Sequence, residues 1–346
     1  MPKLKELLKG LGELSVSGRL DTDVTGVAYD SRKVSPGNLF VAIPGTRTDG
    51  QKFLEEAVER GAAGLVVRDL ADAKARGLNS SVAVVEAGDI RRVLAHVADA
   101  FYAHPSGRVR VVGMTGTNGK TTWTYLTESI FQAAGWKTGV IGTVSYRWGR
   151  EPGGPPENER PASQTTPEAP DLQGLLREMA DEGVDYCLME VSSHGLCLER
   201  VRGISFEAAV FSNLTQDHLD FHATLEDYFE AKRSLFTQHP VRRAVVNLDD
   251  PYGERIWADV KDTPAGEAGF TYGLSPHSSV TAQDVKSDGS GLQFRLIGPG
   301  VEIPVRLRLL GSHNVYNALA AAATALALGI GPEFVADGLE RLESAP

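Results

Sequence analysis

The stretch "VVGMTGTNGKTTW", residues 111–123, decides how the rest of the chain is interpreted. An apolar run enters a loop of Gly, Thr and Asn, and Lys120 and Thr121 follow at once. A strand that feeds a glycine-rich loop and then a helix directs backbone N–H groups and the positive helix end toward an anion. The stretch therefore predicts a phosphate-binding loop between a buried strand and a helix.

Each residue type in this loop supports the prediction. Gly116 and Gly119 allow tight turns without a Cβ clash. Lys120 can reach the outer phosphates of a nucleotide, and Thr121 offers a hydroxyl to Mg²⁺. Met114 stands where the strict G-x-x-x-x-G-K-[ST] pattern has its first glycine, so only the shorter form G-T-N-G-K-T-T remains. The loop predicts binding of a nucleoside triphosphate, with an ordinary strand–helix turn as the alternative, and it does not specify a reaction.

Strand and helix patterns alternate along most of the chain after residue 105. Strands are predicted at 108–114, 137–144, 185–191, 208–214 and 243–248, and helices at 120–135, 170–183 and 225–236. This alternation predicts an α/β fold in which a P-loop-type central domain, 106–346, has a mainly parallel, doubly wound sheet. Alternating apolar residues at 293–298 and 301–309 predict a small antiparallel ribbon. The Pro-, Gly- and Glu-rich segment 148–164 predicts a mobile loop.

Residues 1–105 predict a separate small N-terminal α/β domain. Strands at 38–43 and 62–67 flank a helix at 51–61, and a second helix from residue 89 stops at Pro105. The leucines of residues 1–14 have helical spacing with lysines between them. This spacing favours a docked surface helix over a signal peptide or a helix on a membrane surface.

Composition excludes several classes of protein. The chain has 346 residues, 42% of them hydrophobic, which suits two domains, and its net charge of −10 argues against a general nucleic-acid binder. Cys187 and Cys197 form neither a metal-like pair nor a disulfide framework, which is typical of a reduced, cytoplasmic protein. The apolar stretch 315–330 is too short and Ala-rich to span a bilayer comfortably, so we expect a buried helix and no membrane insertion.

Two further clusters follow predicted strands. Glu190 ends the strand at 185–191 beside Ser192, Ser193 and His194, where a phosphate-transfer site commonly has its metal-holding acid. The segment "SNLTQDHLDFH", 212–222, follows the next strand, and Lys232 comes after it on a helix. The alternatives are a loop carboxylate, a capped turn into a helix and a solvated surface lysine.

Several basic and hydroxyl side chains elsewhere suggest a cradle for an anionic substrate. They are Ser31, Arg32 and Lys33 in the N-terminal domain, Thr165 and Thr166 at the end of the Pro-rich segment, and Arg200. Taken singly, each of them is more typical of an ordinary surface residue.

Together these motifs resemble the Mur ligases of bacterial cell-wall synthesis, and within them the MurE type, which adds the third amino acid to UDP-N-acetylmuramoyl-L-Ala-D-Glu. "GTNGKTT" is general to Mur ligases and to the similar folylpolyglutamate synthetases. "MEVSSHGL", "SNLTQDHLDFH" with "EAKRSLF", and "TTPEAPDL" are more specific to the MurE type. The resemblance covers nearly the whole chain.

The resemblance implies roles for individual residues. Lys120, Glu190, His218 and Lys232 would be the catalytic residues; Thr121 and Glu190 would hold one Mg²⁺, and His218 with a CO₂-carbamylated Lys232 would hold a second. The ATP phosphates would be bound by Gly116, Thr117, Asn118, Gly119, Lys120, Thr121 and Thr122, and the adenine would be bordered by Asn314 and Asn317. The uridine end would contact Ser31, Thr46, Arg47 and Thr48, and the muramoyl-peptide would contact Asn118, Thr165, Thr166, Ser192 and Arg200. One contact is not carried over, because Leu198 stands where the family often has glutamine.

The implied reaction is ATP-dependent amide-bond formation through an acyl phosphate, with diaminopimelate, lysine or ornithine as the incoming amine. The resemblance also implies small-molecule partners only and a monomer. Mur ligases have three domains, and we expect this chain to contain the first two and to lack the third, C-terminal one. The alternatives are a nucleotide- and UDP-sugar-binding module without ligase activity, or a ligase of the folylpolyglutamate synthetase type.

Overall fold

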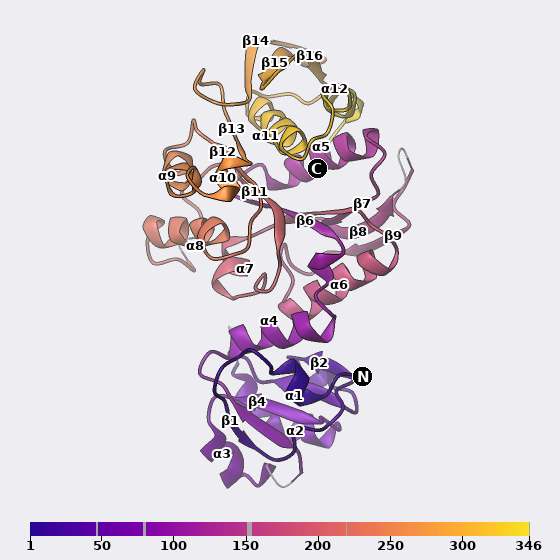
Figure 1. Cartoon of the computed structure of the whole chain (residues 1–346), viewed down its shortest axis with the longest axis vertical. Coiled ribbons are helices and arrows are strands. Elements are labelled where there is room, and N and C mark those ends of the chain that lie inside the picture. The colour runs from indigo at the N-terminus through magenta and orange to yellow at the C-terminus, as the bar shows by residue number, and fades with distance from the viewer. Residues whose placement is uncertain (46–47, 79–80, 151–153, 219, 346) are drawn as a thin grey trace. The chain divides into compact units, whose positions relative to one another are not determined.

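The computed structural model describes residues 1–45, 48–78, 81–150, 154–218 and 220–345 (Figure 1). These residues form two compact units. The first comprises Met1–Pro105, Glu168–Arg177 and Leu198–Gly203, and the second comprises Ser106–Pro167, Glu178–Cys197 and Ile204–Pro346. The first unit therefore contains the predicted N-terminal domain and two later segments that the sequence did not suggest.

The first unit is built on a sheet that has five strands in the described part of the chain. Their order is β1 (Ser15–Ser17), β5 (Ala83–Glu86), β4 (Gly64–Val67), β3 (Asn38–Val41) and β2 (Gly26–Ala28), and only β1 is antiparallel to its neighbour. The α-helices of this unit are α1 (Leu4–Leu7), α2 (Leu54–Glu59), α3 (Leu70–Ala75), α4 (Ile90–Phe101) and most of α6 (Ala169–Asp181). The predicted N-terminal helix is thus only four residues long, although Leu4, Leu7 and Leu8 are buried in the core as its spacing indicated.

The second unit contains the predicted doubly wound sheet, with eight strands among the described residues (Figure 1). The order is β13 (Phe270–Tyr272), β12 (Ala244–Asn247), β11 (Phe206–Phe211), β6 (Arg110–Thr115), β10 (Tyr186–Glu190), β7 (Thr138–Ile141), β8 (Ser145–Arg150) and β9 (Asn158–Pro161). The strands from β13 to β7 are parallel, and only β8 and β9 are antiparallel. The mainly parallel α/β fold is confirmed.

The predicted antiparallel ribbon is also present, as β15 (Gly291–Gly298) and β16 (Val301–Leu307). A third strand, β14 (Thr281–Asp288), which was not predicted, pairs with β15. Only the first two residues of β14 are buried, so the strand lacks a clear hydrophobic alternation that the sequence could have shown.

The expectation of a mobile loop over 148–164 is wrong for much of that segment. Residues 148–150 belong to β8 and residues 158–161 form β9, and the two strands pair in antiparallel register with Tyr146 opposite Arg160. Trp148 is 1% exposed, its indole N–H donates to Glu182 at 3.0 Å, and the Arg160 guanidinium lies 5.0 Å from the centre of its ring. Burial of one large aromatic side chain therefore outweighs the Pro- and Gly-rich composition, and residues 151–153 lie outside the described part.

The remaining helices of the second unit cover its sheets. They are α5 (Lys120–Ala133), the last turn of α6 (Ala169–Asp181), α7 (Ser193–Cys197), α8 (Leu225–Thr237), α9 (Pro251–Val260), α10 (Pro264–Glu267), α11 (His313–Ala327) and α12 (Pro332–Arg341). The Ala-rich α11 is the predicted buried helix, and it packs against α5, α12 and the three-stranded sheet. Within the described ranges, no helix is both long and apolar enough to cross a membrane.

Candidate active site

Three neighbouring parallel strands end at the same edge of the large sheet. In the register of the sheet, Glu190 of β10 lies beside Met114 of β6, and Phe211 of β11 lies beside Thr115 of β6. The residues that follow these strands, including Gly116 and Ser212, therefore meet at the carboxyl edge, where ligands bind in open α/β sheets. The predicted phosphate loop connects β6 to α5 at this edge.

Gly116 and Gly119 are required by close approaches that no other residue would allow. A Cβ atom on Gly116 would lie 1.8 Å from Ser212 Oγ, and one on Gly119 would lie 2.3 Å from Asn317 Oδ1. Gly119 also has φ +90°, a left-handed conformation that favours glycine, at the residue that caps α5. The loop is thus packed tightly against residues that follow β11 and against α11.

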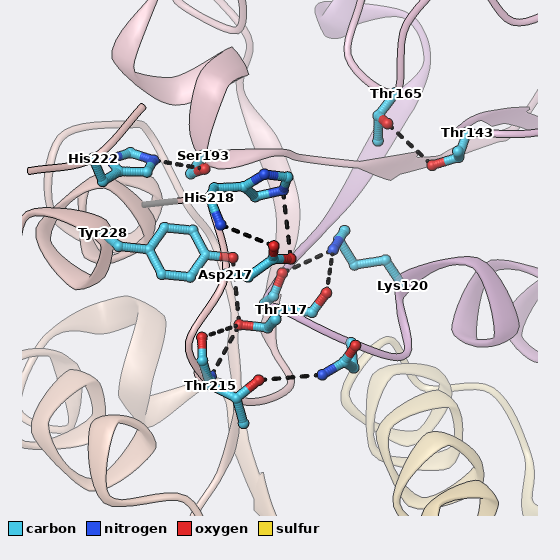
Figure 2. A network of polar contacts seen from close by, with 12 residues as sticks. Thr117, Lys120, Thr143, Thr165, Ser193, Thr215, Asp217, His218, His222 and Tyr228 are labelled. Carbon is cyan, nitrogen blue, oxygen red and sulfur yellow. Dashed lines mark hydrogen bonds and ion pairs between the residues drawn. The ribbon is translucent and has the colours of Figure 1, made fainter. Parts of the chain in front are cut away.

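Lys120 folds back over the loop. Its Nζ donates to the carbonyl oxygens of Gly116 at 2.8 Å and Thr117 at 2.9 Å (Figure 2). Burial lowers the pKa of Lys120, while the charges of Glu190 and Asp217 act in the opposite direction. The ammonium is therefore held where a bound phosphate would replace the loop carbonyls as its partners.

Glu190 is buried at the end of β10 and gathers hydroxyl groups around it. The residue is 1% exposed, and its Oε1 accepts a hydrogen bond from Thr121 Oγ1 at 3.0 Å. Thr143 donates to the same carboxylate with its backbone N–H at 3.1 Å and with its hydroxyl at 3.0 Å. A carboxylate beside a threonine hydroxyl is a hard oxygen donor set of the kind that Mg²⁺ prefers.

Lys232 is buried, which excludes the alternative of a solvated surface lysine. The residue is 1% exposed, and its Nζ donates at 2.8 Å to the carbonyl oxygen of Gly116, which also accepts from Lys120. The Nζ atom lies 4.2 Å from the centre of the Tyr228 ring, one helical turn earlier on α8. Burial, followed by the nearby charge of Lys120, lowers the pKa of Lys232 well below its usual value, and only Asp217 opposes this.

His218 lies beside Asp217 and near Tyr228 (Figure 2). Its Nε2 is 3.6 Å from Asp217 Oδ2, its ring centre is 5.1 Å from that of His194, and its backbone φ is +52°. The nearby His222 is buried and bonded to Ser193 Oγ at 2.9 Å, and burial lowers its pKa. The alternative of a capped turn is present as well, because Thr224 Oγ1 accepts from Asp227 N–H at the start of α8.

Several polar residues of this network were not singled out from the sequence. Tyr228 and Thr117 share a hydroxyl–hydroxyl contact at 3.3 Å, and the N–H of Thr215 donates to the Thr117 hydroxyl at 3.0 Å (Figure 2). Thr143 contacts Thr165 through their hydroxyls at 3.1 Å. The position of Tyr228 four residues before Lys232 was a usable signal, since such residues share a helix face, whereas no pattern marks Thr143.

The predicted substrate residues of the second unit form hydrogen bonds with one another and with the ends of neighbouring strands. Thr166 is 1% exposed; its hydroxyl donates to Glu190 O at 2.9 Å and accepts from Ser192 N–H at 3.0 Å. Ser192 Oγ in turn accepts from Gly195 N–H at 3.0 Å. The Asn118 side chain contacts Thr215 Oγ1 at 3.4 Å. Contact of these residues with a muramoyl-peptide stays a prediction.

The other predicted substrate residues belong to the first unit. Ser31 is buried and donates to Glu56 at 2.8 Å, and Thr48 is exposed. Thr46 and Arg47 lie outside the described residues. Arg200 pairs with Glu168, with 2.8 Å between Nη2 and Oε1. The structure thus places Ser31, Thr48 and Arg200 in one unit and the phosphate loop in the other.

A cavity of about 560 Å³ lies between the phosphate loop and α11. It is lined by Asn118, Gly119, Thr122, Ser212, Asn213, Thr215, Asn247, Asp249, Asp250, Tyr272, His313, Tyr316 and Asn317. Of the two predicted adenine-bordering residues, Asn317 thus lines the cavity, and Asn314 accepts from Asn317 Nδ2 at 2.9 Å. Asn314 therefore orients the residue that lines the wall.

Tyr316 adds an aromatic side chain to this cavity. Its hydroxyl donates to Asp249 Oδ2 at 3.0 Å, and burial together with this carboxylate raises the pKa of Tyr316 to about 12. The Tyr316 hydroxyl is therefore protonated at neutral pH and holds the ring in place.

Comparisons with known proteins agree with this geometry. The model of the Mur ligase middle domain matches residues 114–325, and that of the Mur ligase family catalytic domain matches residues 23–102. The UDP-N-acetylmuramoyl-L-alanyl-D-glutamate–2,6-diaminopimelate ligase 1 of Clostridium acetobutylicum is 40% identical over 99% of this chain and 67% of its own length. The corresponding ligase of Gloeobacter violaceus is 41% identical over the same shares. The chain thus spans about two thirds of these relatives.

Solved structures show the same fold. A UDP-N-acetylmuramoyl-L-alanyl-D-glutamate–2,6-diaminopimelate ligase aligns with a TM-score of 0.84 and 28% identity over 100% of this chain and 67% of its own. MurF from Acinetobacter baumannii aligns with a TM-score of 0.68 and 21% identity over 99% and 68% of the two chains, so this likeness concerns the fold alone. With a family model over more than half of its residues and relatives about 40% identical, the chain belongs to the Mur ligase family.

Proposed function

We propose that this chain serves the ATP-dependent addition of the third amino acid to UDP-N-acetylmuramoyl-L-Ala-D-Glu in peptidoglycan synthesis. One observation carries the proposal: Lys120 and Lys232 donate to the same carbonyl, that of Gly116, in a buried site next to the Thr121–Glu190 pair. This arrangement combines the groups that bind phosphate and metal, and the relatives named above are ligases for this substrate. Their names specify 2,6-diaminopimelate, so this amine is the first to test.

The donor atoms suit Mg²⁺. Thr121 and Glu190 would hold one ion through a hydroxyl and a carboxylate oxygen, and His218 with a carbamylated Lys232 would hold a second. When bound, Mg²⁺ neutralises the charge of the phosphates and of the atoms that react. Glu190 needs no rearrangement to serve, since Thr143 already fixes both of its carboxylate oxygens.

The surroundings of Lys232 support the proposed carbamylation. Its lowered pKa favours the neutral amine, which is the form that attacks CO₂. The nitrogen of the neutral amine bonds to the CO₂ carbon and loses one proton, which leaves an anionic carbamate. The change removes the repulsion between Lys232 and Lys120 and supplies oxygen ligands for a hard cation.

The reaction would proceed in two steps. A carboxylate oxygen of the UDP-dipeptide attacks the γ-phosphorus of ATP, and ADP leaves with the electrons of the broken P–O bond. The amine then attacks the acyl phosphate, and inorganic phosphate leaves from a tetrahedral intermediate. Lys120 and the N–H groups at the start of α5 would stabilise the negative charge on the transferred phosphoryl group.

The other roles complete the proposal. Residues 1–105 would bind the UDP end through Ser31, Thr46, Arg47 and Thr48, and residues 106–346 would bind ATP, with Asn317 bordering the adenine in the cavity. The muramoyl-peptide would contact Asn118, Thr165, Thr166, Ser192 and Arg200. The partners would be small molecules, and the chain would act as a cytoplasmic monomer.

Isothermal titration with UDP-N-acetylmuramoyl-L-Ala-D-Glu, and separately with a non-hydrolysable ATP analogue plus Mg²⁺, tests the proposal. Binding of both ligands is expected. Omission of Mg²⁺ should weaken the binding of the ATP analogue and leave the binding of the UDP-dipeptide unchanged. Binding of the analogue without any binding of the UDP-dipeptide would contradict the proposed substrate. In that case a folate with a glutamate tail becomes the next ligand to titrate, because FPGS of L. casei shares the fold with a TM-score of 0.54.

A further inference from the structure

A buried ion cluster in the first unit joins three segments that are far apart in the sequence. Arg91 comes from α4, Glu168 directly precedes α6, and Arg200 belongs to the segment Leu198–Gly203. The exposed fractions of these side chains are 14% for Arg91, 8% for Glu168 and 11% for Arg200. All three belong to the first unit, so the cluster is independent of how the units are arranged.

The contacts fix the plane of the Arg200 guanidinium. Its Nε donates to Oε1 of Glu168 at 3.0 Å, and its Nη2 lies 2.8 Å from the same oxygen in an ion pair. Two donors of a rigid planar group that share one acceptor leave little rotational freedom at the end of this long side chain. Glu168 is therefore the residue that determines which way the Arg200 guanidinium faces.

Arg91 holds Glu168 from the other side. Its Nη1 is 3.3 Å from Glu168 Oε2, and its Nη2 donates to the carbonyl oxygen of Pro44 at 2.8 Å. Pro44 begins the segment that contains Thr46, Arg47 and Thr48. One carboxylate thus links the arginine assigned to the muramoyl-peptide with the start of the segment assigned to the uridine end.

Burial keeps Glu168 in contact with the two arginines. A buried charge without a partner costs several kcal/mol, so Glu168 cannot leave the cluster without a large penalty. A neighbouring pair shows the contrast: Arg202 and Glu199 are three residues apart and 30% and 25% exposed. That pair lies within the same short segment, Leu198–Gly203, but includes no arginine assigned to the substrate, and it serves as a control.

We propose that Glu168 is a positioning residue, which pre-orients Arg200 for an anionic group of the substrate and ties it through Arg91 to the backbone carbonyl of Pro44. The inference rests on the proposed function for the identity of the ligand, whose peptide carries carboxylates. An arginine already ordered by Glu168 loses less side-chain entropy when the substrate binds. Glu168 therefore contributes to substrate affinity without touching the substrate.

The test is a double-mutant cycle on the affinity for UDP-N-acetylmuramoyl-L-Ala-D-Glu, measured by isothermal titration. Glu168→Ala should weaken binding by about tenfold, and Arg200→Ala by about tenfold or more. The double variant should bind no more weakly than Arg200→Ala alone, because Glu168 acts only through Arg200. Glu199→Ala should bind like the wild type, and all variants should bind the ATP analogue with Mg²⁺ as the wild type does.

Two outcomes would overturn the inference. One is an unchanged affinity in Glu168→Ala, and the other is a loss in the double variant that equals the product of the two single losses. Failure of the wild type itself to bind the UDP-dipeptide would instead overturn the proposed function, and this inference with it. If Glu168→Ala does not fold, as judged by thermal unfolding, Glu168→Gln decides the question: its amide oxygen keeps an acceptor for Arg200, and about a threefold weaker binding is expected. Affinity equal to that of the wild type would contradict the role of Glu168.

Discussion

Buried charges occur in both units, but they are arranged in opposite ways. At the phosphate loop, Lys120 and Lys232 place two amines on one carbonyl, and burial lowers the pKa of both. In the first unit, Arg91 and Arg200 flank Glu168. In the first arrangement both amines bond to an uncharged carbonyl oxygen, and the site is suited to receive an anion and a covalent modification. In the second, each guanidinium has a carboxylate oxygen as its partner, and the cluster is suited to hold a fixed geometry.

The largest expected effect is the loss of activity when Lys232 is replaced. Lys232→Ala should reduce phosphate release in the presence of the UDP-dipeptide, ATP, Mg²⁺ and amine by about 10³-fold, because the carbamate ligand is lost. A short carboxylic acid should restore part of the activity by filling the space. Lys261→Ala, outside the site, is the control and should keep full activity. Full activity of Lys232→Ala would instead show that the reaction does not need a carbamate on Lys232.

A balanced buried pair should instead act on stability. Arg147 and Glu128 are 5% and 3% exposed and 2.7 Å apart. Arg147→Met removes the guanidinium from a buried carboxylate and should lower the free energy of unfolding by about 3–5 kcal/mol. Urea titration followed by circular dichroism measures this. A loss below about 1 kcal/mol would show that the pair resembles a surface ion pair.

The coupling between the two lysines predicts a pH shift. The charge of Lys120 lowers the pKa of Lys232, so Lys120→Met should raise it. Because only the neutral amine reacts with CO₂, carbamylation should then need a higher pH than in the wild type. Carbon-13 spectra with labelled bicarbonate report the carbamate at each pH. A shift toward lower pH would mean that the two amines do not repel each other in solution.

The smallest effect is expected where a pair is exposed. Arg341 and Asp337 are one helical turn apart on α12 and are 57% and 43% exposed. Arg341→Ala should change the free energy of unfolding by only about 0.3–0.5 kcal/mol. The same urea titration measures this. A larger loss would show that solvent exposure does not determine how much an ion pair contributes to the stability of this chain.

The sequence revealed the parts of the site that depend on local pattern. The loop glycines, Lys120 and Glu190 follow strands that alternate with helices, and parallel strands bring their carboxyl ends to one edge. The motif on α11 likewise indicated Asn317. The hydrogen bond by which Asn314 orients Asn317 depends on side-chain geometry and could not be predicted from the motif.

The parts that the sequence did not reveal depend on contacts between distant residues. Nothing near Glu168 indicates that it pairs with Arg91, which is 77 residues away. The hairpin of β8 and β9 was assigned to a loop because composition outweighed the single Trp148, whose burial becomes evident only from its packing. Thr143 holds Glu190 through a contact that spans 47 residues and carries no motif. Contacts between residues that are far apart in the sequence were therefore the part of the site that could not be predicted.

The close packing around Gly116 and Gly119 has a consequence for drug resistance. Ser212 and Asn317, which any added Cβ would strike, are 5% and 7% exposed, and each is held by a hydrogen bond, to Asn118 O at 2.7 Å and to Asn314 Oδ1 at 2.9 Å. Neither can move aside without breaking that bond. An inhibitor that bound the backbone of residues 116–119 would therefore rely on atoms that a point mutation can neither remove nor easily shield.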